Sequence, residues 1–212
     1  MKKTLPTPTI NRIFIYLKVL NDFLNNNIDF ITSKELEKIT GCESTQIRKD
    51  FSFIGKLGKK KKGYHIKSII DYFSEAFKIS RPINVGIIGI GNLGRALISY
   101  KGFEERGFKI VAGFDIDTDK IGWEINNVKI FNIKDIKKVA FKKKIDIVII
   151  TTPKSEVNSI INVIKKTNIK GVLNFASKYI PLDKKVFIKN IDISLELEHM
   201  LYNLINNYNL KR

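Results

Sequence analysis

The sequence predicts an α/β protein with an N-terminal winged helix-turn-helix domain and a C-terminal Rossmann-like, doubly wound parallel sheet. Three observations support this prediction. In the first part of the chain, helical periodicities flank a short glycine-containing turn and lead into a lysine run between glycines. In the second part, apolar strands alternate with helices, and a G-x-G-x-x-G sequence joins the first strand to its helix. We therefore expect domains at 1–80 and 81–191, and a C-terminal dimerisation helix at 192–212.

The composition limits the possible functions. The 212 residues include one cysteine, Cys42, and two histidines, His65 and His199, which excludes an internal disulfide framework and argues against a metal site. No segment approaches the roughly 18 consecutive apolar residues of a membrane span, so we expect a soluble, cytoplasmic protein. The formal net charge of +17 favours an anionic partner.

Two helices are predicted at the start of the chain. Apolar residues recur at near-helical spacing over residues 10–24, and Pro6 and Pro8 are expected to precede that helix. The second helix opens with a capping box, in which Thr32 and Glu35 satisfy each other's backbone amides. We expect this helix to bury Leu36 and Ile39 and to end at Gly41, which adopts a left-handed conformation easily.

A third helix is predicted from Ser44, as its N-cap, to Gly55. Its apolar face consists of Ile47, Phe51 and Ile54. A helix, a short turn and a second helix with exposed donors is the arrangement of DNA-binding helix-turn-helix domains. The residues on the outer face can bind base edges or phosphates, and they are Thr45, Gln46, Arg48, Lys49 and Ser52.

Residues 55–66 are typical of a basic β-hairpin, or wing. The window 48–67 carries a net charge of +7, as much as residues 1–80 together, so the basic charge is concentrated there. Lysines in a wing would bind the DNA backbone without sequence preference and in a salt-sensitive way, although a lysine run is also typical of a solvated loop. The lysines expected at the backbone are Lys59, Lys60, Lys61 and Lys62.

The C-terminal part alternates strands and helices. Apolar strands are predicted at 83–88, 108–114, 145–150 and 172–175. Helices are predicted at 95–106, 133–143 and 155–166. This order favours a parallel doubly wound sheet.

The glycine motif has the context that a dinucleotide-binding site requires, with a strand before it and a helix after it. Gly89 permits a tight turn, Gly91 lets the backbone approach a pyrophosphate, and Gly94 lets helix and strand pack closely, although packing alone could also explain these glycines. Asn92 and Leu93 lie in the motif just before the predicted helix, whose N-terminal free amides favour phosphate.

Asp115 ends the second predicted strand, 21 residues beyond Gly94. An acid at this position accepts hydrogen bonds from a ribose diol and repels a 2′-phosphate, which favours NAD(H) over NADP(H). Thr151, Thr152 and Pro153 follow a later strand at its carboxyl end, where ligands bind in such sheets. Alternatively, Thr152 caps the next helix and Pro153 is its first residue.

A wide apolar stripe covers the last predicted helix, at 193–208. This stripe could pack on the protein's own sheet, or the helix could be exchanged with a partner subunit, since helix-turn-helix proteins usually bind palindromic DNA as two-fold dimers.

The sequence argues against an enzyme. No histidine lies between His65 and His199, and no Lys–His or Tyr–Lys dyad stands out as the acid or base of a hydride-transfer reaction. After the winged domain, a dinucleotide-binding fold fills the remaining chain and leaves no substrate domain.

Several blocks of the sequence resemble the Rex family of redox-sensing transcriptional repressors. They are Gln-Ile-Arg-Lys-Asp-Phe-Ser at 46–52, Gly-Ile-Gly-Asn-Leu-Gly-Arg-Ala-Leu at 89–97, Phe-Asp-Ile-Asp at 114–117 and Asn-Ile-Asp at 190–192. The resemblance implies a homodimer that represses genes of anaerobic metabolism at a palindromic operator. It also implies that NADH releases the protein from DNA, that NAD⁺ competes while permitting binding, and that the C-terminal helix is swapped between subunits.

The resemblance also implies roles for individual residues. Tyr100 and Asp192 would lie near the nicotinamide, and Arg12 would pair with Asp192 across the dimer in the state competent for DNA. Ser44 and Tyr64 complete the expected DNA-binding set. We therefore expect a repressor that responds to NADH and NAD⁺. The alternatives are an NAD-dependent dehydrogenase with a basic appendage and a DNA-binding regulator that senses another nucleotide, such as coenzyme A or ADP-ribose.

Overall fold

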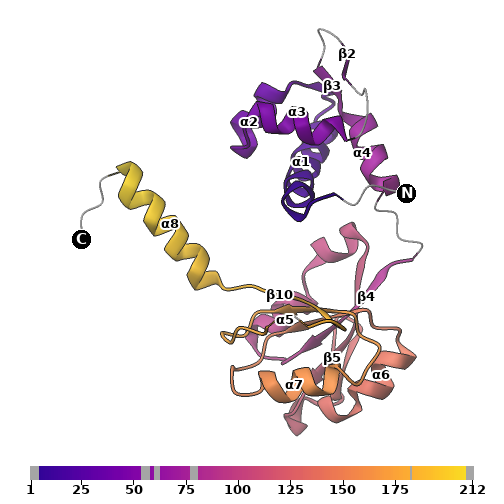
Figure 1. The fold of residues 1–212 in the computed structure, drawn as a ribbon. Coiled ribbons are helices and arrows are strands. Elements are labelled where there is room, and N and C mark those ends of the chain that lie inside the picture. The colour runs from indigo at the N-terminus through magenta and orange to yellow at the C-terminus, as the bar shows by residue number, and fades with distance from the viewer. Residues whose placement is uncertain (1–4, 54–57, 60–62, 77–80, 182, 209–212) are drawn as a thin grey trace. The chain divides into compact units, whose positions relative to one another are not determined.

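The computed structural model describes residues 5–53, 58–59, 63–76, 81–181 and 183–208. The chain divides into two compact units, Met1–Ile79 and Ser80–Arg212 (Figure 1). Within the described ranges, no helix has the length and apolar character needed to cross a membrane.

The described residues of unit 1 form four helices and a small antiparallel sheet with the strand order β1-β3-β2. The winged helix-turn-helix arrangement predicted from the sequence is present, with α2 and α3 as the helix pair and β2 and β3 as the wing. The elements are α1 (Thr7–Asn25), β1 (Phe30–Ile31), α2 (Ser33–Thr40), α3 (Ser44–Ser52), β2 (Gly58–Lys59), β3 (Gly63–His65) and α4 (Ile66–Ala76).

The start and end of α2 follow the prediction. Thr32 and Glu35 form the expected capping box, and Gly41 ends the helix in the left-handed region with φ +70°. The burial predicted for Ile39 is wrong, because its side chain is 50% exposed. Leu36 and Thr40 define the inner face of this short helix, and Ile39 lies about 100° away from Thr40 around the helix axis.

Three other predictions for unit 1 need correction. Pro8 lies inside the first turn of α1, where its missing amide hydrogen breaks no helical hydrogen bond. Glu43, not Ser44, is the N-cap of α3, and the helix ends at Ser52 rather than Gly55. Ile54 lies outside the described residues. Helix α4 was not predicted, although its buried Ile66, Ile69 and Phe73 have helical spacing.

In the described part of unit 2, seven strands form one sheet that is flanked by helices. Its strands are β4 (Ile83–Ile88), β5 (Phe108–Asp115), β6 (Glu124–Ile125), β7 (Val128–Asn132), β8 (Ile147–Ile150), β9 (Gly171–Asn174) and β10 (Phe187–Asn190). Its α-helices are α5 (Asn92–Ile98), α6 (Ile136–Lys142), α7 (Val157–Ile164) and α8 (Ile193–Tyr208), and the short 3₁₀ helices are η1 (Lys101–Arg106), η2 (Thr118–Lys120) and η3 (Ile133–Asp135).

The strand order is β10-β9-β8-β4-β5-β7-β6, and all neighbours are parallel except β6 and β7. From β4 the chain runs outward through β5 and β7, and then crosses over to β8 and runs outward in the other direction. The order therefore reverses between β4 and β8. In doubly wound sheets the ligand crevice lies at the carboxyl ends of the strands at this reversal.

The strand side chains alternate between two apolar cores, one on each face of the sheet. Ile88, Val148 and Ile150 pack with residues of α6 and α7, which lie together on one face (Figure 1). Val85, Ile87 and Ile149 pack with Ile98 of α5 on the other face. Burial on both faces explains why these strands read as continuous apolar runs.

Some predictions for unit 2 were wrong. The helix expected at 95–106 ends at Ile98, because Tyr100 has extended backbone angles before η1 begins. Helix α7 begins only at Val157, after Glu156 as N-cap, so Thr152 does not cap it. The strands β6, β7 and β10 were not predicted. Helix α8 does not pack on its own sheet, since Leu204 is the only one of its side chains at 193–206 that is even partly buried.

Candidate cofactor and nucleic-acid sites

The turn that follows β4 requires glycine at two positions. Gly89 has φ +95°, and a Cβ atom there would lie 2.7 Å from Cγ2 of Thr152. A Cβ atom on Gly94 would overlap the carbonyl oxygen of Gly89. In contrast, nothing lies within 4 Å of the Cβ position of Gly91. Gly89 and Gly94 are therefore required for the close packing of the turn, and the backbone of Gly91 is left accessible.

A cavity of about 540 Å³ opens beside this turn, at the carboxyl ends of β4, β5 and β8. Its volume falls within the range of small-molecule sites, about 300–1,000 Å³. Helix α7 provides the opposite wall through residues such as Ser159 and Val163. The predicted cofactor residues that line the cavity are Gly89, Gly91, Asp115, Thr151, Thr152 and Pro153.

Asp115 is held rigidly at the edge of the cavity. The backbone amide of Ile90 donates to Oδ2 at 2.7 Å, and the amide of Asp117 donates to Oδ1 at 3.0 Å. The ammonium group of Lys120 lies 3.5 Å from Oδ2 and 3.1 Å from the Asp117 carboxylate. Each carboxylate oxygen can accept two hydrogen bonds, so Asp115 keeps acceptor capacity for a ligand hydroxyl.

The two threonines after β8 have different roles. The Thr151 hydroxyl donates toward the carbonyl oxygens of Ile88 and Gly89, at 3.1 and 2.7 Å, and so joins β8 to the glycine turn. The Thr152 hydroxyl is buried and has no hydrogen-bond partner among the described residues. Buried polar atoms are rarely left unpaired, so this hydroxyl indicates a position for a ligand polar group.

Other predicted cofactor residues do not line this cavity. Asn92, Leu93 and Gly94 belong to the first turn of α5, and Tyr100 is 59% exposed beside Phe103. Asp192 caps α8, accepting hydrogen bonds from the amides of residues 194 and 195. Lys120 and Lys134, by contrast, line the cavity and were not predicted. The one sequence feature that could have indicated Lys120 as a cavity residue is its position five residues after Asp115.

In unit 1, α3 presents a polar surface. Thr45, Arg48, Lys49 and Ser52 are exposed, and Ser44 is half-buried. One guanidinium nitrogen of Arg48 donates to the Ser33 hydroxyl at 3.2 Å, which connects the two helices of the helix-turn-helix. This surface has the donors that nucleic-acid binding requires.

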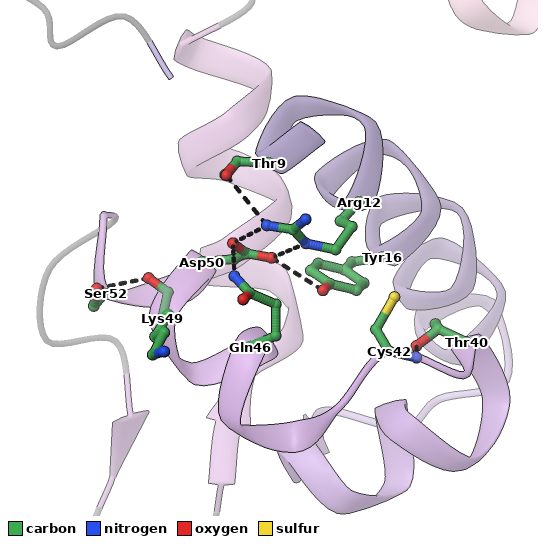
Figure 2. Close-up of polar contacts among 9 residues, drawn as sticks. All are labelled: Thr9, Arg12, Tyr16, Thr40, Cys42, Gln46, Lys49, Asp50 and Ser52. Carbon is green, nitrogen blue, oxygen red and sulfur yellow. Dashed lines mark hydrogen bonds and ion pairs between the residues drawn. The ribbon is translucent and has the colours of Figure 1, made fainter. Parts of the chain in front are cut away.

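The inner side of α3 contains a buried carboxylate, Asp50, which the sequence analysis did not select. Nε and Nη2 of Arg12 donate to its two oxygens, each at 2.7 Å. The Tyr16 hydroxyl and the Gln46 amide donate to it at 3.1 and 2.9 Å. Figure 2 shows these donors converging on Asp50 from α1 and α3, with Thr9 also bonded to Arg12. Gln46, predicted to face outward, is therefore half-buried in this network.

The surroundings of Asp50 shift the titration of the whole cluster. Burial alone would raise the pKa of Asp50, but the hydrogen bonds from Arg12, Gln46 and Tyr16 outweigh burial and lower it. The same contact raises the pKa of Arg12. Burial, with the nearby Cys42 thiol and Asp50, raises the pKa of Tyr16. The ion pair is therefore present throughout the neutral pH range.

The wing is described only in part. β2 pairs with β3, and a Cβ atom on Gly63 would lie 2.5 Å from the backbone oxygen of Ile31, so the neighbouring strand requires glycine there. Tyr64 is half-buried and stacks edge-on against Phe51 at a ring distance of 4.9 Å. The remaining predicted contacts, Lys60, Lys61, Lys62 and the side chain of Lys59, lie outside the described residues.

Two protein families match separate parts of the chain. Residues 4–52 match the family described as putative DNA-binding protein N-terminus, and residues 80–178 match the CoA binding domain family. The matched segments contain the helix-turn-helix and the glycine turn, respectively.

Proteins similar over nearly the whole chain carry one name. The redox-sensing transcriptional repressor Rex of Staphylococcus haemolyticus is 35% identical, over 97% of this chain and 97% of that protein. The Rex protein of Syntrophobacter fumaroxidans is 33% identical, over 94% of this chain and 96% of that protein.

Among solved structures, RSP, a Rex-family repressor, in complex with β-NAD⁺ and operator DNA superimposes with a TM-score of 0.87 at 27% identity, over 97% of this chain and 95% of that one. RSP in complex with β-NADH gives a TM-score of 0.85 at 28% identity, over 97% of each chain. With its winged helix-turn-helix, its Rossmann-like sheet and this similarity from end to end, the chain belongs to the Rex family of redox-sensing transcriptional repressors.

Proposed function

We propose that this protein is a transcriptional repressor that binds a palindromic operator as a homodimer and leaves it when NADH binds. The observation that carries the proposal is the presence, in one chain, of an exposed recognition helix and a dinucleotide-type glycine turn beside a cavity of about 540 Å³. Proteins similar over nearly the whole chain carry the name of a redox-sensing repressor, and the RSP structures contain operator DNA, NAD⁺ or NADH. The protein acts as a regulator in the cytoplasm and not as an enzyme.

The cavity of unit 2 fits the nucleotide. The open backbone at Gly91 leaves room for a pyrophosphate, and the Asp115 carboxylate accepts hydrogen bonds from ribose hydroxyls. The unpaired Thr152 hydroxyl supplies a further polar contact. NAD(H) differs between its two forms by one hydride, which changes the charge of the nicotinamide, and we assign the sensing of that difference to Tyr100 and Asp192.

In unit 1, Arg48 and Lys49 of α3 bind base edges and phosphates in the major groove, with Thr45 and Ser52 beside them. The lysines of the wing, at 59–62, add contacts to the flanking phosphates. Since two subunits bind two half-sites about 34 Å apart, the distance between the recognition helices decides whether the dimer fits its operator.

The switch between the two states joins Arg12 to Asp192 of the partner subunit in the DNA-binding state. In unit 1, Arg12 binds Asp50 through Nε and Nη2. Withdrawing the guanidinium completely would leave a buried carboxylate without its counter-ion, at a cost of about 3–5 kcal/mol. We therefore propose that Arg12 keeps its contact with Asp50 and reaches Asp192 through Nη1.

The test is fluorescence anisotropy of the protein on a labelled fragment of its own upstream region, at fixed salt, with NADH, NAD⁺ and coenzyme A titrated separately. We expect NADH to release the DNA and NAD⁺ to be much weaker. Coenzyme A is included because residues 80–178 match the CoA binding domain family. If coenzyme A released the DNA and NADH did not, the protein would sense coenzyme A and not the redox state. If none of the three compounds changed DNA binding, the proposed sensor would be refuted.

A further inference from the structure

A second cavity, of about 560 Å³, lies on unit 2 between η3, α6 and the segment after α7. We call it the α6 groove. Nine residues line it, and the charge among them is strongly unequal, with Asp135 as the one acid. The five lysines of the lining are Lys134, Lys137, Lys138, Lys142 and Lys166.

The lysines of the α6 groove lack counter-ions within the part of the chain that the structure describes. Among the described residues, none of the five ammonium groups lies within 4.0 Å of a carboxylate. Two other lysines of unit 2 have acidic partners, since Lys165 pairs with Asp183 at 2.8 Å and Lys120 pairs with Asp117 at 3.1 Å. The α6 groove is distinguished by its lining, because five lysines and one acid gather around a single cavity and give it a local excess of positive charge.

Two of these lysines destabilise the helix that carries them. Lys138 and Lys142 of α6 are four residues apart, so their side chains are neighbours on one face, where like charges repel. An anion bound in the α6 groove would relieve that repulsion.

The apolar part of the groove narrows the choice of anion. Phe141 lines it and is 78% exposed, so an apolar ring lies among the lysines. The backbone of a nucleic acid matches this mixture, because its phosphates pair with ammonium groups while its sugar rings offer apolar surface. A small anion such as free phosphate would leave the ring in water.

We infer that the α6 groove binds the phosphate backbone of double-stranded DNA that flanks the operator half-sites. This inference rests on the proposed function. DNA held by the recognition helix of unit 1 is kept at high effective concentration for unit 2 by the chain that connects them. Lysine contacts to phosphates are independent of sequence, so the groove would add affinity and salt sensitivity and leave specificity to α3.

The experiment compares two labelled duplexes, the operator palindrome alone and the same palindrome with flanks of about 15 bp, roughly one and a half helical turns, on each side. The association constant is measured by anisotropy at several salt concentrations between about 50 and 200 mM, and its logarithm is plotted against the logarithm of the salt concentration. The wild-type protein should show a steeper slope on the flanked duplex.

The test variant is K137Q/K138Q/K142Q, which leaves Lys134 intact because that residue also lines the cofactor cavity. The dimer should lose three phosphate contacts in each subunit, six in all, which makes the slope on the flanked duplex shallower by about 5.4 and the loss of affinity over the fourfold salt range roughly 1,800-fold smaller. The slope on the short duplex should not change. The matched control is K109Q/K184Q/K189Q, which removes three exposed lysines of unit 2 that do not line the groove.

The outcomes separate the possibilities. Loss of the slope difference in the groove variant, with its retention in the control, supports the inference, provided that both variants bind NADH like the wild type. An unchanged slope difference in the groove variant, equal wild-type slopes on both duplexes, or an equal effect of the control each overturns it. If the wild-type protein fails to bind even the short operator, the proposed function fails instead.

Discussion

At the scale of single residues, Asp50 joins the recognition helix to α1. Its side chain is fully buried, yet Arg12, Tyr16 and Gln46 direct donors at both of its oxygens. A buried charge is tolerable only with such partners. The position of α3 against α1 therefore depends on this carboxylate. The position of α3 in turn sets where Arg48 and Lys49 lie on its outer face.

The first prediction concerns Asp50→Asn. The amide keeps the shape of the carboxylate but loses its charge and turns an N–H₂ group toward existing donors, so the free energy of unfolding should fall by about 3 kcal/mol at pH 7. The folded-state pKa of Asp50 is lowered, so its stabilisation is present above the unfolded pKa of about 3.9 and is lost as the pH falls through the folded value. The difference in the free energy of unfolding between the wild type and Asp50→Asn, measured by urea unfolding, should therefore become smaller in acid.

A matched control for this prediction is Asp71→Asn, which removes an exposed carboxylate 3.9 Å from Lys67 on α4. Exposed pairs of this kind contribute less than about 0.5 kcal/mol. If the difference in the free energy of unfolding between the wild type and Asp50→Asn stayed constant from pH 7 to pH 2, the proposed contribution of the Arg12–Asp50 ion pair would be contradicted.

The second prediction at this scale is Asp115→Asn. The amide oxygen can still accept from the backbone, but the charge that attracts ribose hydroxyls and repels a 2′-phosphate is gone. We expect NADH affinity to fall about 10-fold, as for the loss of a charge-assisted hydrogen bond, and the preference for NADH over NADPH to shrink. Calorimetric titration with both cofactors checks this, with the exposed Asp119→Asn as control. Unchanged NADH affinity would remove Asp115 from the site.

At the scale of elements, α3 and the cavity of unit 2 should be separable by mutation. Arg48→Ala removes an exposed side chain of α3 that hydrogen-bonds only to Ser33 among the described residues. Operator affinity should fall by a factor of roughly 30 or more, because each subunit of the dimer loses one base-reading arginine at about 1–3 kcal/mol, while NADH affinity stays the same. Anisotropy and NADH titration on one preparation test both parts. Lys38→Ala on α2 is the control, and loss of both activities in Arg48→Ala would indicate misfolding.

Features that depend on local chemistry could be predicted from the sequence. The glycine turn and Asp115 were found because tight turns and ribose binding impose fixed residue types at fixed spacings. Asp50 was missed because a search for apolar periodicity assigns a lone acid to the outer face. Its partner Arg12 lies 38 residues away in the sequence, and only the tertiary fold brings the two together.

Two of the strands that the sequence analysis missed, β6 and β10, share a physical reason. Strands β6 and β10 lie at the edges of the sheet, and their short, partly exposed sequences show no apolar run. Lys120 and Lys134, which line the cavity beside the glycine turn, come from segments without a recognisable motif. Such residues become neighbours of the site only through the order of the strands.

For the whole molecule, a cofactor in unit 2 can affect DNA binding by unit 1 only if it binds one dimer geometry more tightly than the other. That requirement makes the dimer interface part of the sensor. The strongest candidate surface in the chain is α8, whose apolar side chains are exposed within one chain, including Leu197 at 59%, Met200 at 58% and Leu201 at 38%. A helix with this stripe is stable only if another surface covers it.

The prediction at this scale is that Leu197→Asp together with Leu201→Asp converts the dimer to a monomer. Two carboxylates in the apolar stripe cannot be buried without a large desolvation cost, so the partner should no longer cover the helix. A monomer engages one half-site at a time, and operator affinity should fall at least 100-fold because the second half-site no longer contributes. Sedimentation velocity and anisotropy measure the two effects. The control, Asn203→Asp with Asn206→Asp, adds the same charge to exposed polar positions of α8 and should stay dimeric. A double leucine variant that remained a dimer would exclude α8 from the interface and would require the NADH signal to pass through another surface of unit 2.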